Sequence, residues 1–486
     1  MTNHTLFQFF EWNVPNDGAH WRRLKEQAEH LAKMGISAVW IPPATKAIGQ
    51  NDVGYGIYDL YDFGEFQQKG SLRTKYGTKK ELMKAISQLH DKGIQVYLDI
   101  VLNHKAGADE TERFMAQEVS MDNREEILTE PYEIEAWTKF NFPGRGDMYS
   151  DFKWNWTHFT GTDYNVEKDK ASIYKIIGEN KDWGDEVDDE FGNYDYLMFT
   201  DIDYKHPDVY NEVIKWGIWV VNELNIDGFR LDAIKHINHW FVRDFLKYVR
   251  EGTKKQELYA VGEYWKSNIE VLQEQLENVD YELDLFDVPL HYNFYEASKA
   301  GKDYDLRKIF QGTLVELNPI HSVTFVDNHD SQPGQSLESW VEDWFKPLAY
   351  GLILLRKDGY PCVFYGDYYG ISGEDAMEGK KELLDKLLYL RKCYTYGEQV
   401  DYLDHPNTIG WVRLGEEEFS NSGAAIIITN GEEGEKLMSV GAHRAGEKWI
   451  DFLGHREETV IIDEEGNGCF TVNGGSISVW VKADAN

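Results

Sequence analysis

The first part of the chain alternates short apolar runs with segments of helical periodicity. Apolar runs span residues 6–11, 37–43 and 95–104. Between them, residues 21–34 and 79–92 repeat apolar side chains every three or four positions, and a glycine follows each segment, as is common at helix ends. Near-continuous apolar strands that alternate with helices predict a parallel sheet covered by helices on both faces.

The alternation breaks after the third strand and then resumes. Residues 105–205 are polar, aromatic and acidic with little clear period, which predicts an inserted domain of irregular β content. Five more strands are predicted, at residues 228–233, 258–263, 283–288, 322–327 and 361–365, with helices at 207–224, 240–251 and 381–390. Eight such units predict a (β/α)8 TIM barrel. An open doubly wound sheet would need a glycine-rich loop after the first strand, and Phe10–Pro15 contains no glycine.

Helical patterns end near Gly397. Apolar strands follow at residues 410–414, 424–429, 459–462 and 476–481, with Asn-Gly turn signals at positions 430 and 473. This pattern predicts a small C-terminal antiparallel β-sandwich. The predicted domains are therefore a barrel formed by 1–104 and 206–396, an insert at 105–205, and a sandwich at 397–486.

Composition and charge restrict the partners. With 42% hydrophobic and 28% charged residues in 486, the chain is typical of folded globular proteins. A net charge of -35 argues against nucleic acid or an anionic membrane as a partner, but it allows a neutral substrate and bound cations. No run approaches the roughly 20 apolar residues that a membrane span requires.

Cysteine usage indicates the compartment. The chain has three cysteines, Cys362, Cys393 and Cys469, none in a CxxC pair, so a disulfide framework is not expected. Reduced thiols favour a cytoplasmic protein. No signal-peptide pattern precedes the first strand, although secretion with a removed signal peptide is the alternative.

Carboxylates follow several of the predicted strands, at the end where barrel active sites lie. Asp232, Glu263 and Asp330 come from three different strands and are expected to converge. A lone strand-end aspartate is more often a helix cap, so the set is the signal. Arg230 lies two residues before Asp232 and on the same strand face, where a purely structural ion pair is the alternative.

Paired carboxylates are the tools of glycoside hydrolysis. Arg230 would keep Asp232 ionised and hence nucleophilic. Glu263 follows an apolar run, and partial desolvation would raise its pKa and suit it to general acid catalysis. His104 and His329 could donate hydrogen bonds to sugar hydroxyls.

Four segments resemble the ordered signature regions of the α-amylase family: 99–104, 228–232, 262–265 and 325–330. Two more, 53–60 and 68–77, resemble the bacterial liquefying α-amylases and their intracellular relatives. The resemblance covers essentially the whole chain. It implies endo-hydrolysis of α-1,4-glucosidic bonds in starch, glycogen and maltooligosaccharides by a retaining double displacement.

The resemblance also implies roles for individual residues. Asp232 would be the nucleophile, Glu263 the general acid/base, and Asp330 the group that stabilises the transition state. The residues expected to bind the sugar are Tyr55, His104, Arg230, Lys235, His329 and Trp265. Any single aromatic residue is more often part of a core, and the chain has 16 Trp and 29 Tyr.

A calcium site is expected between barrel and insert. Asn103, Asp195 and Asp201 supply the oxygen atoms that a hard cation prefers. The resemblance implies the same ligands together with the backbone carbonyl of His236, and calcium there would fix the insert over the active mouth.

Further metal sites of the secreted relatives are not expected. At their second cluster Asp163 and Asp203 match, but Gly184 and Lys205 replace acids. At a site between barrel and sandwich, Asn407 and Asn430 also replace acids. One calcium is therefore predicted.

Two other functions remain open. The same catalytic residues would serve an exo-acting maltooligosaccharide-forming enzyme or a glucan transglycosylase. An inactive glycan-binding relative should lack a carboxylate, whereas all three are present. The expected partner is an α-glucan, and the protein is expected to be a monomer.

Overall fold

The computed structural model describes residues 3–419 and 421–483. The eight predicted strands form a closed parallel barrel, which confirms the predicted fold class. In barrel order they are β1 (Leu6–Gln8), β2 (Ala38–Ile41), β5 (Gln95–Ile100), β12 (Gly228–Leu231), β13 (Tyr259–Gly262), β14 (Asp284–Phe286), β15 (Ser322–Phe325) and β16 (Tyr360–Phe364). Their inward side chains form a compact apolar interior that includes Trp40, Val261 and Phe325.

Helices surround the barrel. They are α1 (His20–Met34), α2 (Lys79–Asp91), α3 (Pro207–Leu224), α4 (His239–Thr253), α5 (Ile269–Asn278), α6 (Val288–Ala300), α7 (Leu314–Leu317), α8 (Lys346–Leu354), α9 (Tyr365–Tyr369) and α10 (Lys381–Cys393). Local signals mark the starts of two of them: Thr78 and Glu81 form a capping box on α2, and Pro207 occupies the first turn of α3. No helix in the described residues has the length and apolarity needed to cross a membrane.

The third barrel strand is shorter than its apolar run predicts. β5 ends at Ile100, and His104 begins β6 (His104–Lys105), which pairs with β11 (Thr200–Ile202) in the insert. The chain leaves the barrel here because Asn103 accepts the backbone N–H of Ile202 at 3.0 Å. The insert is a six-stranded sheet completed by β7 (Glu110–Val119), β8 (Tyr132–Lys139), β9 (Phe159–Asn165) and β10 (Lys170–Ile176).

The C-terminal part is the expected antiparallel β-structure. A six-stranded sheet contains β19 (Gln399–Tyr402), β20 (Thr408–Arg413), β21 (Ala424–Thr429), β23 (Lys448–Asp451), β24 (Val460–Ile461) and β26 (Ser476–Lys482). A two-stranded sheet of β22 (Gly434–Ser439) and β25 (Asn467–Val472) faces it. A core including Val412, Met438, Trp449 and Phe470 joins the sheets.

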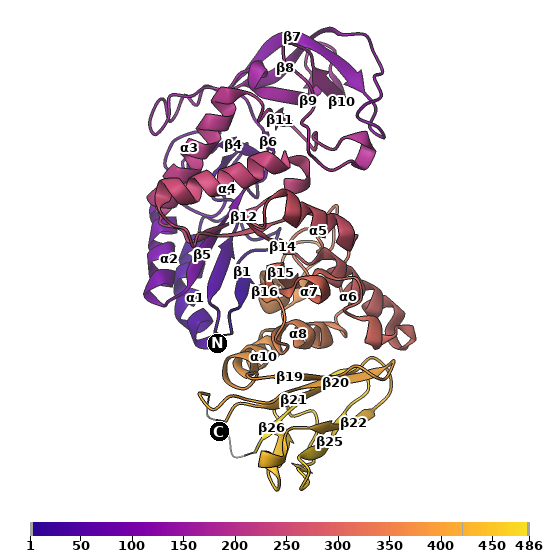
Figure 1. The fold of residues 1–486 in the computed structure, drawn as a ribbon. Helices are drawn as coiled ribbons and strands as arrows, with labels where there is room; N and C mark the ends of the chain where they lie inside the picture. The colour runs from indigo at the N-terminus through magenta and orange to yellow at the C-terminus, as the bar shows by residue number, and fades with distance from the viewer. Residues whose placement is uncertain (1–2, 420, 484–486) are drawn as a thin grey trace.

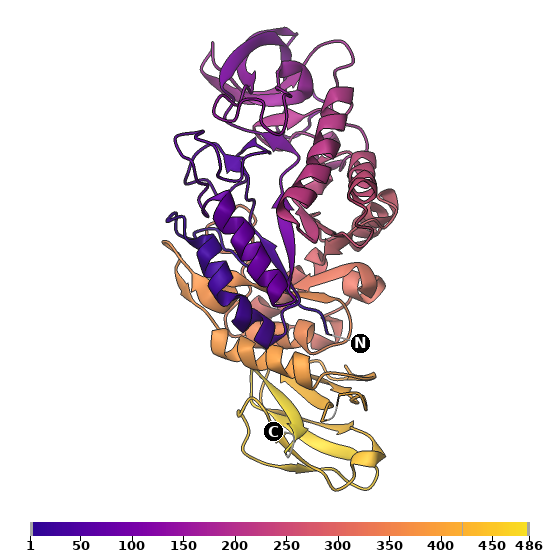
Figure 2. The same ribbon diagram turned by 90° about the vertical axis from the view of Figure 1, so that its left-hand side faces the viewer.

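The three parts are stacked along one direction (Figure 1). The insert lies at the end of the barrel where the strands finish, and the C-terminal sheets lie at the opposite end, as the turned view also shows (Figure 2). The insert therefore overhangs the end at which the sequence places the carboxylates. The domain limits themselves remain a prediction.

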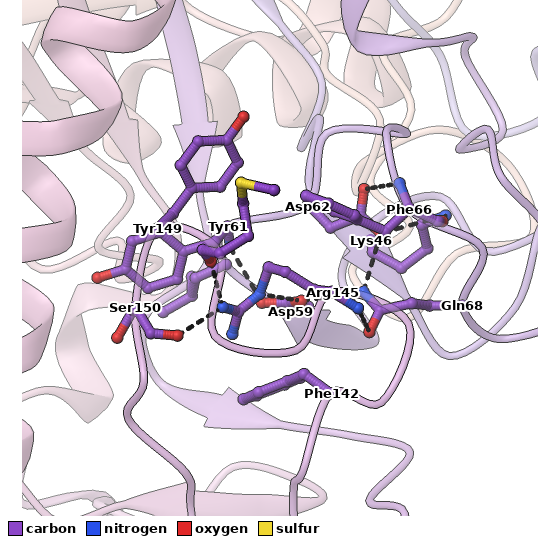
Figure 3. A network of polar contacts seen from close by, with 12 residues as sticks. Lys46, Asp59, Tyr61, Asp62, Phe66, Gln68, Phe142, Arg145, Tyr149 and Ser150 are labelled. Atoms are coloured by element: carbon purple, nitrogen blue, oxygen red, sulfur yellow. Dashed lines mark hydrogen bonds and ion pairs between the residues drawn. The ribbon is translucent and has the colours of Figure 1, made fainter.

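A buried polar network ties the insert to a loop of the barrel (Figure 3). Arg145 Nε donates to Asp59 Oδ2 at 2.8 Å, and Gln68 Nε2 donates to the same oxygen at 3.0 Å. Asp59 ends β4 (Ile57–Asp59), which pairs with β3 (Lys46–Ala47) in a hairpin that the apolar pattern did not predict. The network holds the segment that carries Tyr55 against the insert.

Candidate active site

A buried arginine organises the open end of the barrel. Arg230 on β12 lies directly opposite Asp99 on β5, and its side chain is fully buried. Nη1 lies 2.9 Å from Asp99 Oδ1 and 2.6 Å from Asp232 Oδ1, while Nη2 lies 3.5 Å from Glu263 Oε2. One guanidinium thus links acids from three adjacent strands, so Arg230 and Asp232 pair as the sequence predicts.

A strained turn brings Asp232 and Glu263 together. Ala233 adopts left-handed backbone with φ of 49°, which is unusual for a residue with a side chain. In this conformation its N–H donates to Glu263 Oε2 at 2.8 Å. Two predicted catalytic residues are therefore joined through one backbone group.

Asp330 faces the same mouth from the segment after β15. Asn328 Oδ1 accepts the backbone N–H of Asp330 at 2.9 Å, and His329 Nε2 lies 3.2 Å from Asp330 Oδ2. His329 also lies 2.6 Å from the hydroxyl of Tyr55, which donates to Asp99 at 2.8 Å. This chain connects Asp330 with the arginine cluster.

The carboxylates of Asp232, Glu263 and Asp330 are mostly buried but remain partly accessible to solvent. Their side chains are 13% (Asp232), 10% (Glu263) and 21% (Asp330) exposed, whereas Asp99 is fully buried, so only the first three can reach a ligand. Burial raises the pKa of Glu263 and of Asp330. Burial also raises the pKa of Asp232, and the adjacent Arg230 opposes that rise.

The sequence analysis missed Asp99 as a site residue. Asp99 accepts hydrogen bonds from Trp40 Nε1 at 3.0 Å, from Tyr55 and from Arg230. Burial raises its pKa to about 7 against the lowering effect of Arg230. The available signal was an acid inside an apolar strand, which requires a buried cationic partner.

The predicted sugar-binding residues are spread around this cluster. His104 Nε2 donates to the backbone carbonyl of Tyr55 at 2.8 Å, and burial lowers its pKa to about 4, so the ring is neutral. Lys235 Nζ lies 3.4 Å from Glu190 of the insert. Trp265 packs against His291 and donates to the Tyr292 hydroxyl at 3.0 Å, inside the apolar interior.

A pocket of about 350 Å³ lies in the insert and the loops beside it. Phe199, one of its lining residues, packs against His104 with ring centroids 5.4 Å apart. The other walls include Ile48, Lys69, Trp137, Asp163 and Tyr164. The insert thus carries a pocket whose Phe199 wall is one side chain away from the site residue His104.

Two buried carboxylates meet where calcium is predicted. Asn103 Nδ2 donates to Asp201 Oδ1 at 3.2 Å, and Thr160 donates to Asp201 Oδ2 at 2.6 Å. Burial raises the pKa of Asp195 to about 6, and burial followed by the charge of Asp195 raises that of Asp201. No lysine or arginine pairs with either acid in the described part of the chain. The donor set fits a hard cation, which would replace a shared proton.

The acids do not form the proposed ligand set by themselves. Among the described residues, no three His, Cys, Asp or Glu side chains are arranged to hold a metal. The remaining predicted ligand is a backbone carbonyl, that of His236, whose ring Nδ1 donates to the Tyr194 carbonyl at 2.7 Å. Gly184 lets Asp195 approach closely, because a Cβ at position 184 would lie 2.3 Å from Asp195 Oδ1.

Lysines lie beside the acids at the position of the relatives' second metal cluster. The Lys181 ammonium binds Asp203 and the carbonyl of Thr157, with Lys181 and Asp203 both nearly buried. Lys205 Nζ donates to the Trp183 carbonyl at 3.0 Å and lies 3.6 Å from Asp185. The ammonium groups of Lys181 and Lys205 therefore pair with these acids and donate hydrogen bonds to these carbonyls.

Amides bridge the barrel and the C-terminal sheets. Asn407 Nδ2 donates to Asn430 Oδ1 at 3.0 Å and to the Lys302 carbonyl at 2.6 Å. Asn430 Nδ2 donates to the carbonyls of Gly301 and Tyr304 at 2.8 Å each. Direct hydrogen bonds therefore connect the two parts here.

Comparison with known proteins identifies the family. The family described as Alpha amylase, catalytic domain matches residues 11–398. A glucan 1,4-alpha-maltohexaosidase of Bacillus sp. (strain 707) is 54% identical over 484 residues, covering 99% of this chain and 93% of the relative. The cytoplasmic alpha-amylase of Escherichia coli (strain K12) is 46% identical and covers 99% of both chains. An α-amylase structure from Geobacillus thermoleovorans shares the fold, with a TM-score of 0.65, 19% identity and coverage of 99% of this chain and 97% of that one. The chain therefore belongs to the α-amylase family of glycoside hydrolases.

Proposed function

We propose that this protein cleaves internal α-1,4-glucosidic bonds of starch, glycogen and maltooligosaccharides with retention of configuration. The observation that carries the proposal is the placement of Asp232 and Glu263 on either side of the Arg230 guanidinium, at 2.6 Å and 3.5 Å, with Asp330 facing the same mouth. Two carboxyl groups with different environments are the requirement for a double displacement.

Asp232 has the environment of the nucleophile. Its direct contact with Arg230 favours the ionised form more strongly than the longer contact of Glu263 does. Asp232 attacks the anomeric carbon while the Glu263 carboxyl gives its proton to the leaving oxygen. Glu263 then takes a proton from water, which attacks the anomeric carbon and releases Asp232. Asp330 orients the sugar hydroxyls as positive charge develops on the ring.

The neighbouring side chains hold the sugar at the cleavage point. Tyr55 and the neutral His329 present polar groups beside Asp330, and Trp12 stacks on Tyr55 with an angle of 4° between the rings. His104 and Lys235 complete the proposed set, and the fully buried Arg230 acts on the sugar through Asp232 and Glu263. The contacts of Trp265 favour core packing instead, so its predicted sugar-binding role is the weakest of the group.

Replacement of the two carboxylates tests the roles. Glu263→Gln should lower kcat by about 100-fold or more and still bind maltooligosaccharide, because the proton donor is lost. Asp232→Asn should abolish covalent trapping by a fluorosugar. The exposed Glu274→Gln on α5 is a matched control that should retain activity. An adduct on a residue other than Asp232, or full turnover by Glu263→Gln, would contradict the assignment.

Release of oligosaccharides of one length is the second candidate activity. The relative of Bacillus sp. (strain 707) is named for maltohexaose release, and the pocket beyond His104 offers room for additional sugar units. The products from a maltoheptaoside blocked at its non-reducing end separate the two activities. Cleavage of the blocked substrate supports internal attack, and its resistance supports an exo-acting enzyme.

Alpha-amylases generally bind calcium. We propose a single calcium held by Asn103, Asp195, Asp201 and the His236 carbonyl, where it would neutralise two buried acids and fix the insert. The pairing of Lys181 with Asp203 supports one ion rather than a linked group, because an ammonium already neutralises the second acid. Calorimetric titration of the metal-free protein should give one site per chain.

We also propose a monomeric cytoplasmic protein. The free thiols of Cys362, Cys393 and Cys469 and the name of the Escherichia coli relative support that location. Light scattering and cell fractionation test the two statements separately.

A further inference from the structure

A loop of the insert reaches the residues that follow both catalytic strands. Asp188 lies in this loop, and its side chain is only 3% exposed. Its backbone N–H donates to the Lys235 carbonyl at 2.9 Å, three residues after Asp232. Its carboxylate meets the segment that begins with Glu263.

The contacts of the Asp188 carboxylate are specific. Tyr264 donates its hydroxyl to Oδ2 at 2.8 Å, and Lys266 Nζ lies 3.1 Å from Oδ1. Oδ1 also accepts the backbone N–H of Glu190 at 2.9 Å. Burial alone would raise the pKa of Asp188, but these three donors hold it below its ordinary value, so the carboxylate is ionised.

Glu263 needs such an anchor because it is the first residue after β13. Its backbone N–H donates to Leu231 at 2.9 Å and its carbonyl accepts from Ile234 at 3.1 Å, which fixes the main chain on the β12 side only. Beyond it, the Tyr264 hydroxyl ends on Asp188, and Lys266 Nζ lies between Asp188 at 3.1 Å and Glu190 of the same loop at 3.0 Å. A displacement of this segment would move the Glu263 carboxyl relative to the bond it protonates.

We propose that Asp188 is a positioning residue for Glu263, acting through Tyr264 and Lys266. The inference rests on the proposed role of Glu263 as the general acid. It makes the insert a part of the catalytic apparatus, because one buried carboxylate of the insert positions the main chain of the proton donor, whose Oε2 is held by the Ala233 N–H. Asp188 itself does not touch the substrate.

The test exploits a substrate that needs no proton donor. A maltotriosyl fluoride releases fluoride without protonation, whereas a maltooligosaccharide releases a sugar hydroxyl that requires it. The measured quantity is kcat/KM for the maltooligosaccharide divided by kcat/KM for the fluoride. A general loss of folded protein lowers both rate constants and leaves this ratio unchanged.

The benchmark is Glu263→Gln, which should lower the ratio by about 100-fold or more. Asp188→Asn should lower the ratio in the same direction by about ten-fold, because small displacements of a catalytic group are costly. The control is Asp189→Asn, an exposed neighbour whose side chain forms no hydrogen bond or ion pair among the described residues, and its ratio should stay within about two-fold of the wild type.

The outcomes separate the two proposals. A wild-type ratio in Asp188→Asn, beside a lowered ratio in Glu263→Gln, overturns the positioning role alone. A wild-type ratio in Glu263→Gln overturns the proposed acid itself, and the positioning role with it. If Asp188→Asn does not fold, Tyr264→Phe removes one hydrogen bond, and it should lower the ratio by about three-fold. An unchanged ratio in that variant also overturns the inference.

Discussion

Arg230 Nη1 lies 2.9 Å from Asp99 Oδ1, although 131 residues separate the two along the chain. Their strands pair in register, so the contact is a direct result of barrel closure. Because the same nitrogen binds Asp232, Asp99 competes with the proposed nucleophile for one positive charge.

Asp99→Asn should therefore lower the pKa of Asp232, since Arg230 Nη1 would then contact the Asp232 carboxylate alone. The acidic limb of kcat/KM against pH should move to lower pH. The fold should lose about 1–3 kcal/mol, because a buried charge-assisted hydrogen bond is weakened. Kinetics across the acid range and a thermal melt measure the two effects. An acidic limb at the wild-type position, in a folded variant, would show that Asp99 does not influence the nucleophile.

Calcium should stabilise the protein more at neutral than at acidic pH. The folded-state pKa of Asp195 is raised to about 6, so its protonated form contributes stability below the ordinary pKa of 3.8, and that contribution is lost as pH rises through about 6. Calcium binds the ionised acids and offsets the loss, by about 2.7 kcal/mol at 100 times its Kd.

Thermal melts with calcium and with chelator, at about pH 5 and about pH 7.5, check this expectation. Asp195→Asn removes the titrating acid and should reduce the pH dependence of the calcium effect. A calcium effect that is equal at both values, or larger in acid, contradicts the proposed ligands.

Arg145 should be important for stability rather than for chemistry. Its side chain and that of Asp59 are each 1% exposed, and Nη1 also donates to the carbonyls of Met148 and Ser150 at 2.6 and 2.7 Å. Arg145→Met leaves Asp59 as a buried acid without its ion-pair partner, which costs about 3–5 kcal/mol.

The exposed Arg113 is a matched control, because it pairs with Glu133 and Glu135 at the surface. Arg113→Met should cost less than about 1 kcal/mol. Urea unfolding of both variants provides the comparison. Equal losses would refute the importance of burial.

Trp265→Phe should destabilise the fold and leave sugar binding intact. Its indole is buried with Phe325 and His291 and donates to Tyr292, so the truncation should cost about 1–3 kcal/mol. KM for maltooligosaccharides should stay within about two-fold of the wild type. A strong rise in KM with unchanged stability would instead restore the stacking role that the sequence suggested.

Much of the fold follows from local patterns. Apolar runs such as Ser322–Phe325 predict buried parallel strands, because only a strand covered on both faces tolerates such a run. Similar reasoning predicts Asp232, Glu263 and Asp330 as site residues, since a carboxylate beside an apolar run must meet a partner or an opening.

Other features depend on contacts that no local pattern contains. The strands of the β3–β4 hairpin are too short to show a period in the sequence. The hairpin is held instead by Arg145, which lies 86 residues from Asp59 along the chain. Asp188 stands in a run of acids in which burial distinguishes it from Asp189. His104 was assigned to the third barrel strand because its apolar run continues past the point where the chain turns into the insert.

The bridging amides of Asn407 and Asn430 have a practical consequence. Since an amide keeps its hydrogen bonds whether or not divalent ions are available, an agent that sequesters these ions should loosen the junction between insert and barrel. The junction between barrel and C-terminal sheets should not respond. Amide exchange in such a buffer would then accelerate around Asp195 and Asp201, while the seam between helices and terminal sheets would stay as slow as before.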